Sequence, residues 1–302
     1  MVKQFSRHIL ALFFLFISLQ SAAQTTAPAV RFGVIADIQY ADQPDRGTRY
    51  YRRSLQKMDS CVADLNNEQL AFSAVFGDLV DQGPKDLGPV MAQLKRLKAG
   101  FRNVLGNHDF VGVSDRDALF RQFEMPAPYY AFEKGGWMFI VLNTNEVSGY
   151  GANEGAPVRK EWEAQIDGLK KAGRKNMQPW NGGVSRRQLS WLEQQLAKAK
   201  KKKENVLVFT HHPLFPESGY ETLNNRAVLA ILEKFPNVKG ILSGHHHTGG
   251  FAYYNRIPAV TLEGMIETPD QNAYGVVELY PDKIVLTGRG RMSSRTLLFN
   301  SK

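Results

Sequence analysis

Residues 30–39 read VRFGVIADIQ, and this pattern recurs through the rest of the chain. Its first part is largely apolar and rich in β-branched side chains, which predicts a buried strand over Val30–Ala36. Asp37 and Gln39 follow where that strand ends. Acidic and amide side chains in this position indicate a binding edge, because ligands of α/β sheets bind at the carboxyl ends of the strands.

Apolar runs of this kind alternate with segments of helical periodicity. Two such segments span residues 48–66 and 185–203, and Ser185 provides a good N-cap for the second. The runs predict strands over Val30–Ala36, Phe72–Phe76, Phe101–Leu105, Trp137–Leu142, Val206–Thr210, Val238–Leu242, Ala252–Tyr254, Ala259–Leu262, Tyr274–Leu279 and Ile284–Thr287. Parallel β-α units followed by an antiparallel meander favour an α/β sandwich of two sheets covered by helices. With no internal repeat or linker, we expect residues 30–297 to form a single domain.

The composition is that of a globular protein, with 43% hydrophobic and 22% charged residues. These values exclude a disordered chain, a collagen-like repeat and a polytopic membrane protein. The net charge of +9 is compatible with an anionic substrate, a nucleic acid or an acidic membrane surface. The lone cysteine, Cys61, excludes an intrachain disulfide and a thiolate zinc site. It lies beside the apolar stripe of the 48–66 helix, which predicts a structural thiol.

Residues 1–23 have the layout of a secretory signal peptide. The bases Lys3 and Arg7 precede an apolar run over 9–19, and the small residues 21–23 precede Gln24. As a helix, that run would reach about 16 Å, too short for a bilayer core of roughly 30 Å. We therefore expect cleavage before Gln24, an exported protein (periplasmic or secreted) and no stable membrane anchor. Loss of the two bases, with no acid in the segment, reduces the charge to +7.

Polar clusters follow five of the predicted strands. Each cluster alone is an ordinary turn or cap, but five in succession at strand ends indicate one functional site. Six of the seven histidines fall within them. The clusters are Asp37–Gln39, Gly77–Asp81, Gly106–Asp109, His211–Pro213 and Gly244–His247.

Seven side chains of these clusters have the chemistry of metal ligands. Carboxylates, amide oxygens and imidazoles without a thiolate suit Mn²⁺, Fe²⁺ or Mg²⁺ better than a structural zinc. They predict a two-metal site in which Asp78 bridges the ions and a shared hydroxide attacks phosphorus. The predicted ligands are Asp37, Gln39, Asp78, Asn107, His211, His245 and His247.

Other residues of the clusters have predicted supporting roles. His108 is the candidate general acid for the leaving oxygen, and Asp109 is expected to orient its ring. Asp81 is expected to hold a metal-bound histidine in place. His212 and His246 alternate with predicted ligands along an extended chain, so we expect structural roles for both.

Taken in order, these motifs resemble those of the calcineurin-like metallophosphoesterase superfamily. The resemblance implies a four-layer α/β/β/α sandwich with a binuclear centre at the sheet edge. This chain departs from the usual Asp-x-His of the first motif, because Gln39 stands at the histidine position. The resemblance implies one metal on Asp37, Gln39, Asp78 and His247, and the other on Asp78, Asn107, His211 and His245.

Four further segments are similar to the manganese-dependent ADP-ribose/CDP-alcohol diphosphatases, and the resemblance runs from about residue 32 to 290. These segments are residues 32–42, 49–55, 181–192 and 261–269. The resemblance implies two divalent ions, Mn²⁺ foremost with Fe²⁺, Mg²⁺ or Zn²⁺ as alternatives. It also implies a small nucleoside diphosphate substrate, cleaved at its phosphoanhydride, and no nucleic-acid partner. The loop Tyr40–Thr48 is shorter than in the vertebrate members, which bears on base and alcohol preference.

The sequence offers weaker candidates for substrate contacts. Arg226 precedes a helix and is a candidate for the second phosphate, although an exposed helix-end arginine is an equal reading. Tyr40, Trp180 and Tyr220 are candidates to stack on a base, although aromatics beside loops more often pack. The oligomeric state is not set by the sequence.

Three other functions stay open at this stage. The same metal chemistry serves phosphodiesters, cyclic nucleotides and phosphomonoesters. The basic charge also admits a nuclease or nucleic-acid-binding protein, but the densest run, Lys200–Lys203, reads as a solvated helix end far from the strand-end clusters. An inactive binding protein is disfavoured because none of the seven predicted ligand positions carries an apolar residue.

Overall fold

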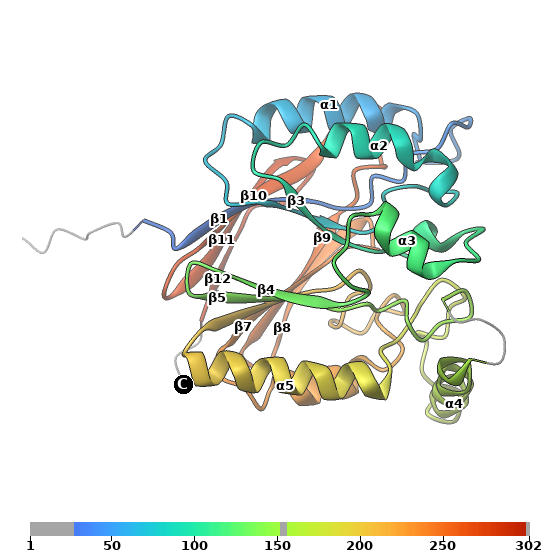
Figure 1. The fold of residues 1–302 in the computed structure, drawn as a ribbon, viewed down its shortest axis with the longest axis vertical. Coiled ribbons are helices and arrows are strands. Elements are labelled where there is room, and N and C mark those ends of the chain that lie inside the picture. Colours follow the sequence, from blue (N-terminus) through green and yellow to red (C-terminus); the bar gives the residue numbers. More distant parts are fainter. Residues whose placement is uncertain (1–26, 152–155, 300–302) are drawn as a thin grey trace, which may run out of the picture.

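The computed structural model describes residues 27–151 and 156–299, which form two six-stranded sheets packed face to face (Figure 1). The predicted signal peptide, residues 1–23, lies outside the described residues. In the first sheet, the strands in spatial order are β12 (Arg295–Leu298), β11 (Lys283–Gly290), β10 (Ala273–Leu279), β1 (Val30–Ile35), β2 (Ser73–Phe76) and β3 (Phe101–Val104). In the second, they are β4 (Tyr130–Lys134), β5 (Trp137–Val141), β6 (Asn205–Phe209), β7 (Val238–Ser243), β9 (Ile257–Glu263) and β8 (Thr248–Tyr254).

Parallel strands occupy the part of each sheet that carries the polar clusters. β1 pairs in parallel with β2, and β2 with β3, whereas β10, β11 and β12 form an antiparallel meander beside β1. β5, β6, β7 and β9 are parallel, flanked by antiparallel β4 and β8. Parallel strands share a direction. The carboxyl ends of β1, β2 and β3 therefore lie at one edge of the first sheet, and those of β5, β6, β7 and β9 lie at one edge of the second.

Helices cover the outer faces of both sheets. Figure 1 shows α1 and α2 above the first sheet and α5 below the second. The helices are α1 (Arg53–Leu65), α2 (Leu87–Leu94), α3 (Arg116–Gln122), α4 (Pro157–Lys171), α5 (Arg186–Lys202) and α6 (Asn225–Leu232), with the 3₁₀ turns Pro84–Asp86 and His108–Phe110. The layers follow the order α/β/β/α, so the four-layer sandwich implied by the resemblance is confirmed.

Side chains that alternate along the strands of the second sheet pack against the layers on both of its faces. Leu207 and Phe209 of β6 belong to the core shared with the first sheet, whereas Val206 and Val208 pack in the cluster that contains α5 and α6 residues. Successive side chains of a strand point to opposite faces, so one strand serves two cores. Between the sheets, the rings of Phe32 and Phe139 meet edge to face with centroids 5.7 Å apart.

Several elements differ from the prediction. The strands β4 and β12 and the helices α2, α3 and α4 were not predicted, because their apolar patterns are short or interrupted. The first helix starts at Arg53 rather than near Thr48, since backbone bonds between Arg46 and Arg49 close a turn before it. The Ser185 cap is confirmed: its hydroxyl accepts from the backbone amide of Gln188.

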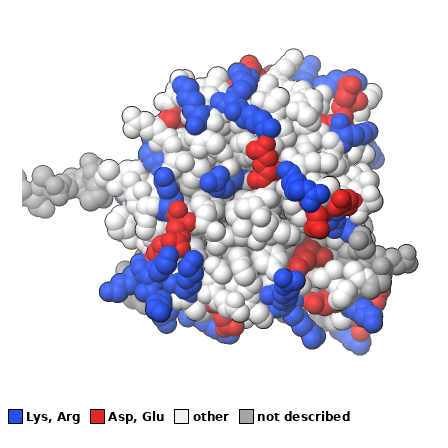
Figure 2. Space-filling view, in the orientation of Figure 1, with Lys and Arg blue, Asp and Glu red and all other residues white. Residues whose placement is uncertain are grey.

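The lysine run lies at the C-terminal end of α5, as predicted. Figure 2 shows a group of basic side chains at the lower left, over that end of the helix, with basic and acidic residues interspersed elsewhere on this face. Lys198 and Lys202 both pair with Glu133 of β4. Among the described residues, no helix is both long enough and apolar enough to cross a bilayer.

Candidate metal centre

The five polar clusters meet where the two sheets adjoin. Asp37, Asp78 and Asn107 follow β1, β2 and β3 of the first sheet, whereas His211 and His245 follow β6 and β7 of the second. The site therefore straddles two sheets rather than the edge of a single one. A backbone hydrogen bond from Gly244 N to His211 O joins the two clusters of the second sheet. The His245 amide donates to the Asp37 carboxylate and so links the sheets.

Four predicted ligands form one half of the centre. Asp78 Oδ2 accepts from Gln39 Nε2 at 3.0 Å. Gln39 Nε2 lies 3.3 Å from His247 Nε2, which in turn lies 3.8 Å from Asp37 Oδ1. The structure thus brings together the residues expected to hold the first metal.

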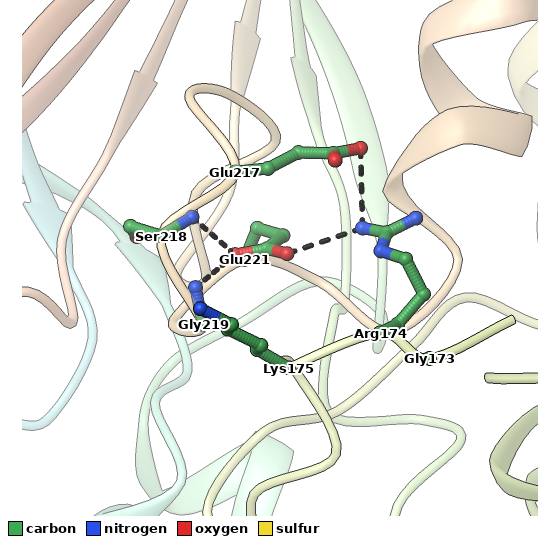
Figure 3. Close-up of a pocket in the computed structure, with 7 residues that line it drawn as sticks. All are labelled: Gly173, Arg174, Lys175, Glu217, Ser218, Gly219 and Glu221. Atoms are coloured by element: carbon green, nitrogen blue, oxygen red, sulfur yellow. Dashed lines mark hydrogen bonds and ion pairs between the residues drawn. The ribbon is translucent and has the colours of Figure 1, made fainter. Parts of the chain in front are cut away.

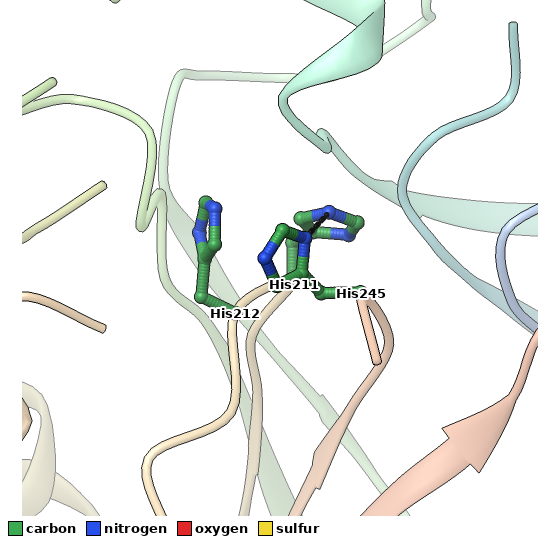
Figure 4. A group of neighbouring side chains, drawn as sticks. All are labelled: His211, His212 and His245. Carbon is green, nitrogen blue, oxygen red and sulfur yellow. Dashed lines mark hydrogen bonds between the residues drawn. The ribbon is translucent and has the colours of Figure 1, made fainter. Parts of the chain in front are cut away.

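The other half begins again at Asp78, whose Oδ2 lies 3.4 Å from His211 Nε2. The same His211 nitrogen lies 3.2 Å from Asn107 Oδ1 and 3.2 Å from His245 Nδ1. Figure 4 shows the His211 and His245 rings turned toward each other. Asp78 Oδ2 thus contacts Gln39 of the first half and His211 of the second, which is the position a bridging carboxylate requires.

The backbone is strained at these ligands. Asp37, Gln39, Asp78 and His245 have φ values of 51°, 43°, 50° and 72°, in the left-handed region that non-glycine residues seldom adopt. Such conformations cost on the order of 1–3 kcal/mol each and cluster at functional sites. Here they turn the chain sharply at the strand ends, and Gln39, Asp78 and His245 line one cavity.

Each of the three histidines has one ring nitrogen held by a protein oxygen. His211 Nδ1 donates to Phe76 O at 2.8 Å, and His245 Nε2 donates to Asn181 Oδ1 at 3.0 Å. His247 Nδ1 lies 2.8 Å from Glu267 Oε1. These bonds fix the tautomer and leave the other nitrogen free for a cation, as in metal-binding histidines generally.

The donor set fits a pair of divalent ions. Asp37, Asp78 and His211 offer ligand atoms within 4.8 Å of one another, all from buried side chains. Gln39 Oε1 is buried and has no hydrogen-bond partner in the described part of the chain. An orphaned amide oxygen in a polar cluster is costly unless a cation or water satisfies it. With its amide turned over, so that Oε1 takes the place of Nε2 beside Asp78 and His247, Gln39 would offer this oxygen to a metal.

The two buried carboxylates of the cluster differ, because burial raises the pKa of Asp37 whereas Asp78 is kept charged. Burial alone would raise the pKa of Asp78, but His211 and His108 hold it well below its usual range. Burial lowers the pKa of His211 while Asp78 raises it, with a net rise to about 9. For His245, burial and the neighbouring His212 and His211 lower the pKa well below its usual range. A metal ligand must be unprotonated, which the lowered pKa of His245 favours, whereas His211 would release its proton when a cation binds.

His108 is held by Asp81, not by Asp109. The His108 Nδ1 donates to Asp81 O at 3.0 Å and lies 3.2 Å from Asp81 Oδ1. The carbonyl can only accept, so Nδ1 carries the hydrogen and Nε2 is the nitrogen left for proton transfer. The prediction that Asp81 orients a metal-bound histidine is thus corrected: it orients His108.

Asp109 has a different function in the structure. Its carboxylate accepts from the backbone amides of Asp78, Leu79, Val80 and Gly106 at 2.8–3.2 Å. Those four bonds use the carboxylate fully, so the predicted contact with the His108 ring is wrong. Asp109 instead fixes the loops that present Asp78 and Asn107.

His212 and His246 take the structural roles predicted for them. His212 Nδ1 lies 2.8 Å from Thr144 Oγ1 and Nε2 lies 2.9 Å from Trp180 O, so both ring nitrogens are occupied. Its ring packs edge to face against His245 and His211, with centroids 4.3 and 5.0 Å apart (Figure 4). Burial lowers the pKa of His212 to about 3. His246 stacks on Tyr220 with centroids 4.2 Å apart.

A cavity of about 430 Å³ opens over the centre. Five predicted ligands and His108 line it, together with three residues that we call the outer wall: Arg49, Trp180 and Tyr220. Trp180 is 42% exposed, and Tyr220, one face of which is covered by His246, is 37% exposed, so both rings keep surface that a ligand can contact. They were named as candidates in the sequence, but Arg49 was not, although it lies in one of the segments that carry the resemblance.

Two predicted substrate contacts do not line this cavity. Tyr40 packs against the main core, beside the bridge that it forms with Val80. Arg226 is exposed and forms a two-point ion pair with Glu217 at 2.8 and 3.0 Å. Both predictions are therefore corrected, since the residue types fitted the role but the loop geometry directs them elsewhere.

Glu217 lines another pocket, of about 300 Å³ (Figure 3). The side chains that line this pocket hold the loop that carries Tyr220 in place. Arg174 donates to Glu221 at 3.1 Å and lies 3.1 Å from Glu217. The Glu221 carboxylate also accepts from the amides of Ser218 and Gly219. The loop on either side of Tyr220 is thus fixed by its own acidic residues.

Sequence reasoning also missed the acceptors behind the histidines. Glu267 and Asn181 hold His247 and His245, yet each lies far along the chain from its histidine. Lys57 of α1 extends this support, because its ammonium donates to the carbonyls of Met265, Glu267 and Thr268. The sequence pointed to Asn181 and Glu267 only indirectly, because both lie in segments that resemble the ADP-ribose/CDP-alcohol diphosphatases.

Comparison with known proteins agrees with this geometry. The model of the calcineurin-like phosphoesterase family matches residues 30–249. The chain belongs to this family. A manganese-dependent ADP-ribose/CDP-alcohol diphosphatase from Homo sapiens is 31% identical, over 90% of this chain and 93% of that protein. A protein of the same name from Oryza sativa subsp. japonica is 32% identical, over 92% and 96%.

Among solved structures, a dimetal phosphatase from Danio rerio superposes with a TM-score of 0.81 at 28% identity. It covers 90% of this chain and all of that one. This calcineurin-like phosphoesterase is therefore a hydrolase with His and Asp groups able to bind a dimetal centre, and the relatives named above are manganese-dependent.

Proposed function

We propose that this phosphoesterase hydrolyses the phosphoanhydride of nucleoside diphosphate conjugates of the ADP-ribose and CDP-alcohol class. The observation that carries the proposal is the continuity of its cavity, which joins the metal ligands to an arginine and two exposed aromatic rings. A substrate with two phosphates and a base has partners for each part there. Relatives that bear this activity in their names match along nine-tenths of the chain.

The residues divide the chemistry between them. Asp37, Gln39, Asp78 and His247 would hold one divalent ion, and the same Asp78 with Asn107, His211 and His245 would hold the other. When bound, such ions activate water at neutral pH and neutralise charge on the reacting phosphate.

The chain itself supplies the acid. Asp81 fixes Nδ1 of His108, a residue that lines the cavity, and so leaves Nε2 as the nitrogen that would pass a proton to the departing phosphate oxygen. Asp109 contributes by holding the amides of the Asp78 loop at fixed positions, which limits reorganisation during the reaction.

A substrate panel tests the proposal. The protein would be stripped of metal, reloaded with Mn²⁺ and assayed against ADP-ribose, CDP-choline, a cyclic nucleotide, an aryl phosphomonoester and single-stranded DNA. We expect kcat/KM to be highest for a diphosphate, with a nucleoside monophosphate as one product. Turnover of the monoester or of DNA, with none of either diphosphate, would overturn the proposal and favour another phosphoesterase activity.

We further propose that residues 1–23 direct export. The support is the sequence pattern alone, with a basic start, a short apolar run and small residues before Gln24. Mass spectrometry of the protein recovered from the periplasmic or secreted fraction should find an N-terminus at Gln24. Full-length protein retained with the cytosol would contradict this.

A further inference from the structure

A group of exposed lysines lies at the end of the molecule opposite the metal centre. Lys203 comes just before β6, whereas the predicted ligand His211 comes just after it. Because a strand rises about 3.3 Å per residue, β6 separates these two ends by roughly 17 Å. Figure 2 shows basic side chains gathered over the C-terminal end of α5, at the lower left. We call the group the lysine end, and its members are Lys134, Lys198, Lys200, Lys201, Lys202 and Lys203.

The fold neutralises little of this charge. Glu133 pairs with Lys198 at 3.2 Å and with Lys202 at 2.7 Å. The other four members of the lysine end form no ion pair with a carboxylate in the described part of the chain. Glu204, the acid that directly follows the lysine run, is half-buried. The lysine end therefore presents several ammonium groups to solvent that have no acidic partner among the described residues.

The described chain begins beside the lysine end. A Cβ added at Gly135, next to Lys134, would lie 2.6 Å from the carbonyl oxygen of Ala29, so Ala29 packs directly on the turn between β4 and β5. The same turn accepts a hydrogen bond at Gly136 O from the amide of Asn205, where β6 begins. In Figure 1 the start of β1 and the C-terminal end of α5 lie on one side of the molecule, and α3 and α4 lie on the other. The residues that precede the described chain are therefore attached at the lysine end.

From these observations we infer that the lysine end docks on an anionic lipid bilayer, with the catalytic cavity directed away from the membrane. An ammonium is a compact charge that needs no matched geometry, so a cluster of lysines suits a fluid array of lipid phosphates. The lysine end includes no arginine or aromatic side chain of the kind that stacks on bases, which favours lipid over nucleic acid. If residues 1–23 direct export, as proposed, they hold this same end next to the bilayer until they are cleaved. The inference is independent of the substrate proposed above.

Sedimentation with vesicles tests the inference. Mn²⁺-loaded protein, freed of excess ion, would be mixed at low salt with vesicles of phosphatidylcholine, alone or with about one-third phosphatidylglycerol. Binding to the neutral vesicles measures any contribution of the N-terminal segment. We expect wild type to bind the anionic vesicles more tightly, and the triple variant Lys200→Gln, Lys201→Gln, Lys203→Gln to lose roughly 100-fold in partition coefficient, at about fivefold per lysine. Wild type that does not prefer the anionic vesicles would overturn the inference.

The matched control removes the same charge from α4, on the other side of the molecule. The triple variant Lys160→Gln, Lys170→Gln, Lys171→Gln changes three exposed lysines of that helix. Because exposed charges are screened beyond about 10 Å at 0.1 M salt, its partition coefficient should change by less than about threefold. Equal losses in both triple variants would show that binding follows net charge alone and would overturn the inference. Tighter binding of wild type to single-stranded DNA than to anionic vesicles, lost in the lysine-end variant, would overturn it in favour of a nucleic acid.

Turnover on the vesicles tests the orientation. With the lysine end on the membrane, the cavity opens away from the lipid, so vesicle-bound wild type should keep its kcat/KM for a soluble substrate within about twofold. A larger loss on anionic vesicles, absent in the lysine-end variant, would place the cavity toward the bilayer and overturn the orientation. Any substrate that the panel above shows to be hydrolysed serves for this measurement. Failure of the proposed diphosphatase activity would therefore leave the test of docking intact.

Discussion

The metal centre and the outer wall of one cavity are built in different ways. The ligands of the centre sit directly at strand ends, and Asp37 and His211 are fully buried. The outer-wall residues Arg49, Trp180 and Tyr220 come from loops, and Trp180 is 42% exposed. Strands fix a side chain through paired backbone on both sides, whereas a loop is fixed only where particular bonds anchor it.

The difference indicates a division of labour. Residues of the metal centre should control metal content and turnover of every substrate. Residues of the outer wall should control which substrate is turned over. A variant of the outer wall that lost metal, or a variant of the metal centre that changed only substrate preference, would contradict this division.

Asp78→Asn should have the largest effect, because Asp78 contacts both halves of the centre. We expect loss of bound Mn²⁺ and at least about a 1,000-fold fall in kcat for all substrates, since metals contribute several kcal/mol to such reactions. Elemental analysis and initial rates measure the two. Asp42→Asn, an exposed carboxylate paired with Arg52, is the control. Full Mn²⁺ content in Asp78→Asn would remove it from the ligand set.

His108→Ala should lower kcat by roughly 10²- to 10⁴-fold, the usual contribution of general acid catalysis, with metal content unchanged. Asp81→Asn should give a smaller loss in the same direction, because the backbone carbonyl of Asp81 still holds His108 Nδ1. Rates on a substrate with an acidic leaving group would recover in both variants. If His108→Ala also lost metal, His108 would be a ligand and not the acid.

Glu267→Gln should weaken metal binding without abolishing turnover. Glu267 accepts from His247 Nδ1 at 2.8 Å, and loss of such a partner typically costs 10- to 100-fold in metal affinity. Titration of metal-free protein with Mn²⁺ measures the change, and saturating Mn²⁺ should restore most of the rate. A lower rate that excess Mn²⁺ does not restore would assign Glu267 a direct part in the reaction.

Arg226→Ala should have the smallest effect, with less than a twofold change in kcat/KM. The hydrogen bond from Arg226 lowers the pKa of Glu217 below its ordinary value of 4.5. The contribution of this pair to stability is therefore present above about pH 4.5 and is lost as the pH falls through the lowered pKa. Unfolding curves of wild type and variant should converge at low pH. A large loss of diphosphate turnover would restore Arg226 as a phosphate contact.

These two regions also differ in how far the sequence predicts them. Asp37, Asp78 and His211 could be placed because each directly follows an apolar run, and strand direction brings such positions together. Their arrangement across two sheets could not, since nothing local shows which strands pair. Tyr40 and Arg226 failed because the direction of a loop side chain depends on partners distant in sequence, here the main core and Glu217.

The support around the site was hidden for the same reason. Asp109 stands beside His108 in the chain, which suggested contact, but four backbone amides compete for its carboxylate and take it. Asp81 lies farther from His108 in sequence, yet is the residue that orients it. Adjacency in sequence therefore did not predict which carboxylate contacts the His108 ring, because buried backbone N–H groups need acceptors and took the nearer one.

The number of Mn²⁺ ions bound per chain tests the central claim most directly. Metal-free protein would be titrated with Mn²⁺ and, after removal of free ion, measured by elemental analysis alongside Asp78→Asn. Because Asp78 joins the two ligand sets, we predict two ions per wild-type chain and a loss of both in the variant. A single ion in wild type, or two retained in Asp78→Asn, would contradict a dimetal centre built on this carboxylate.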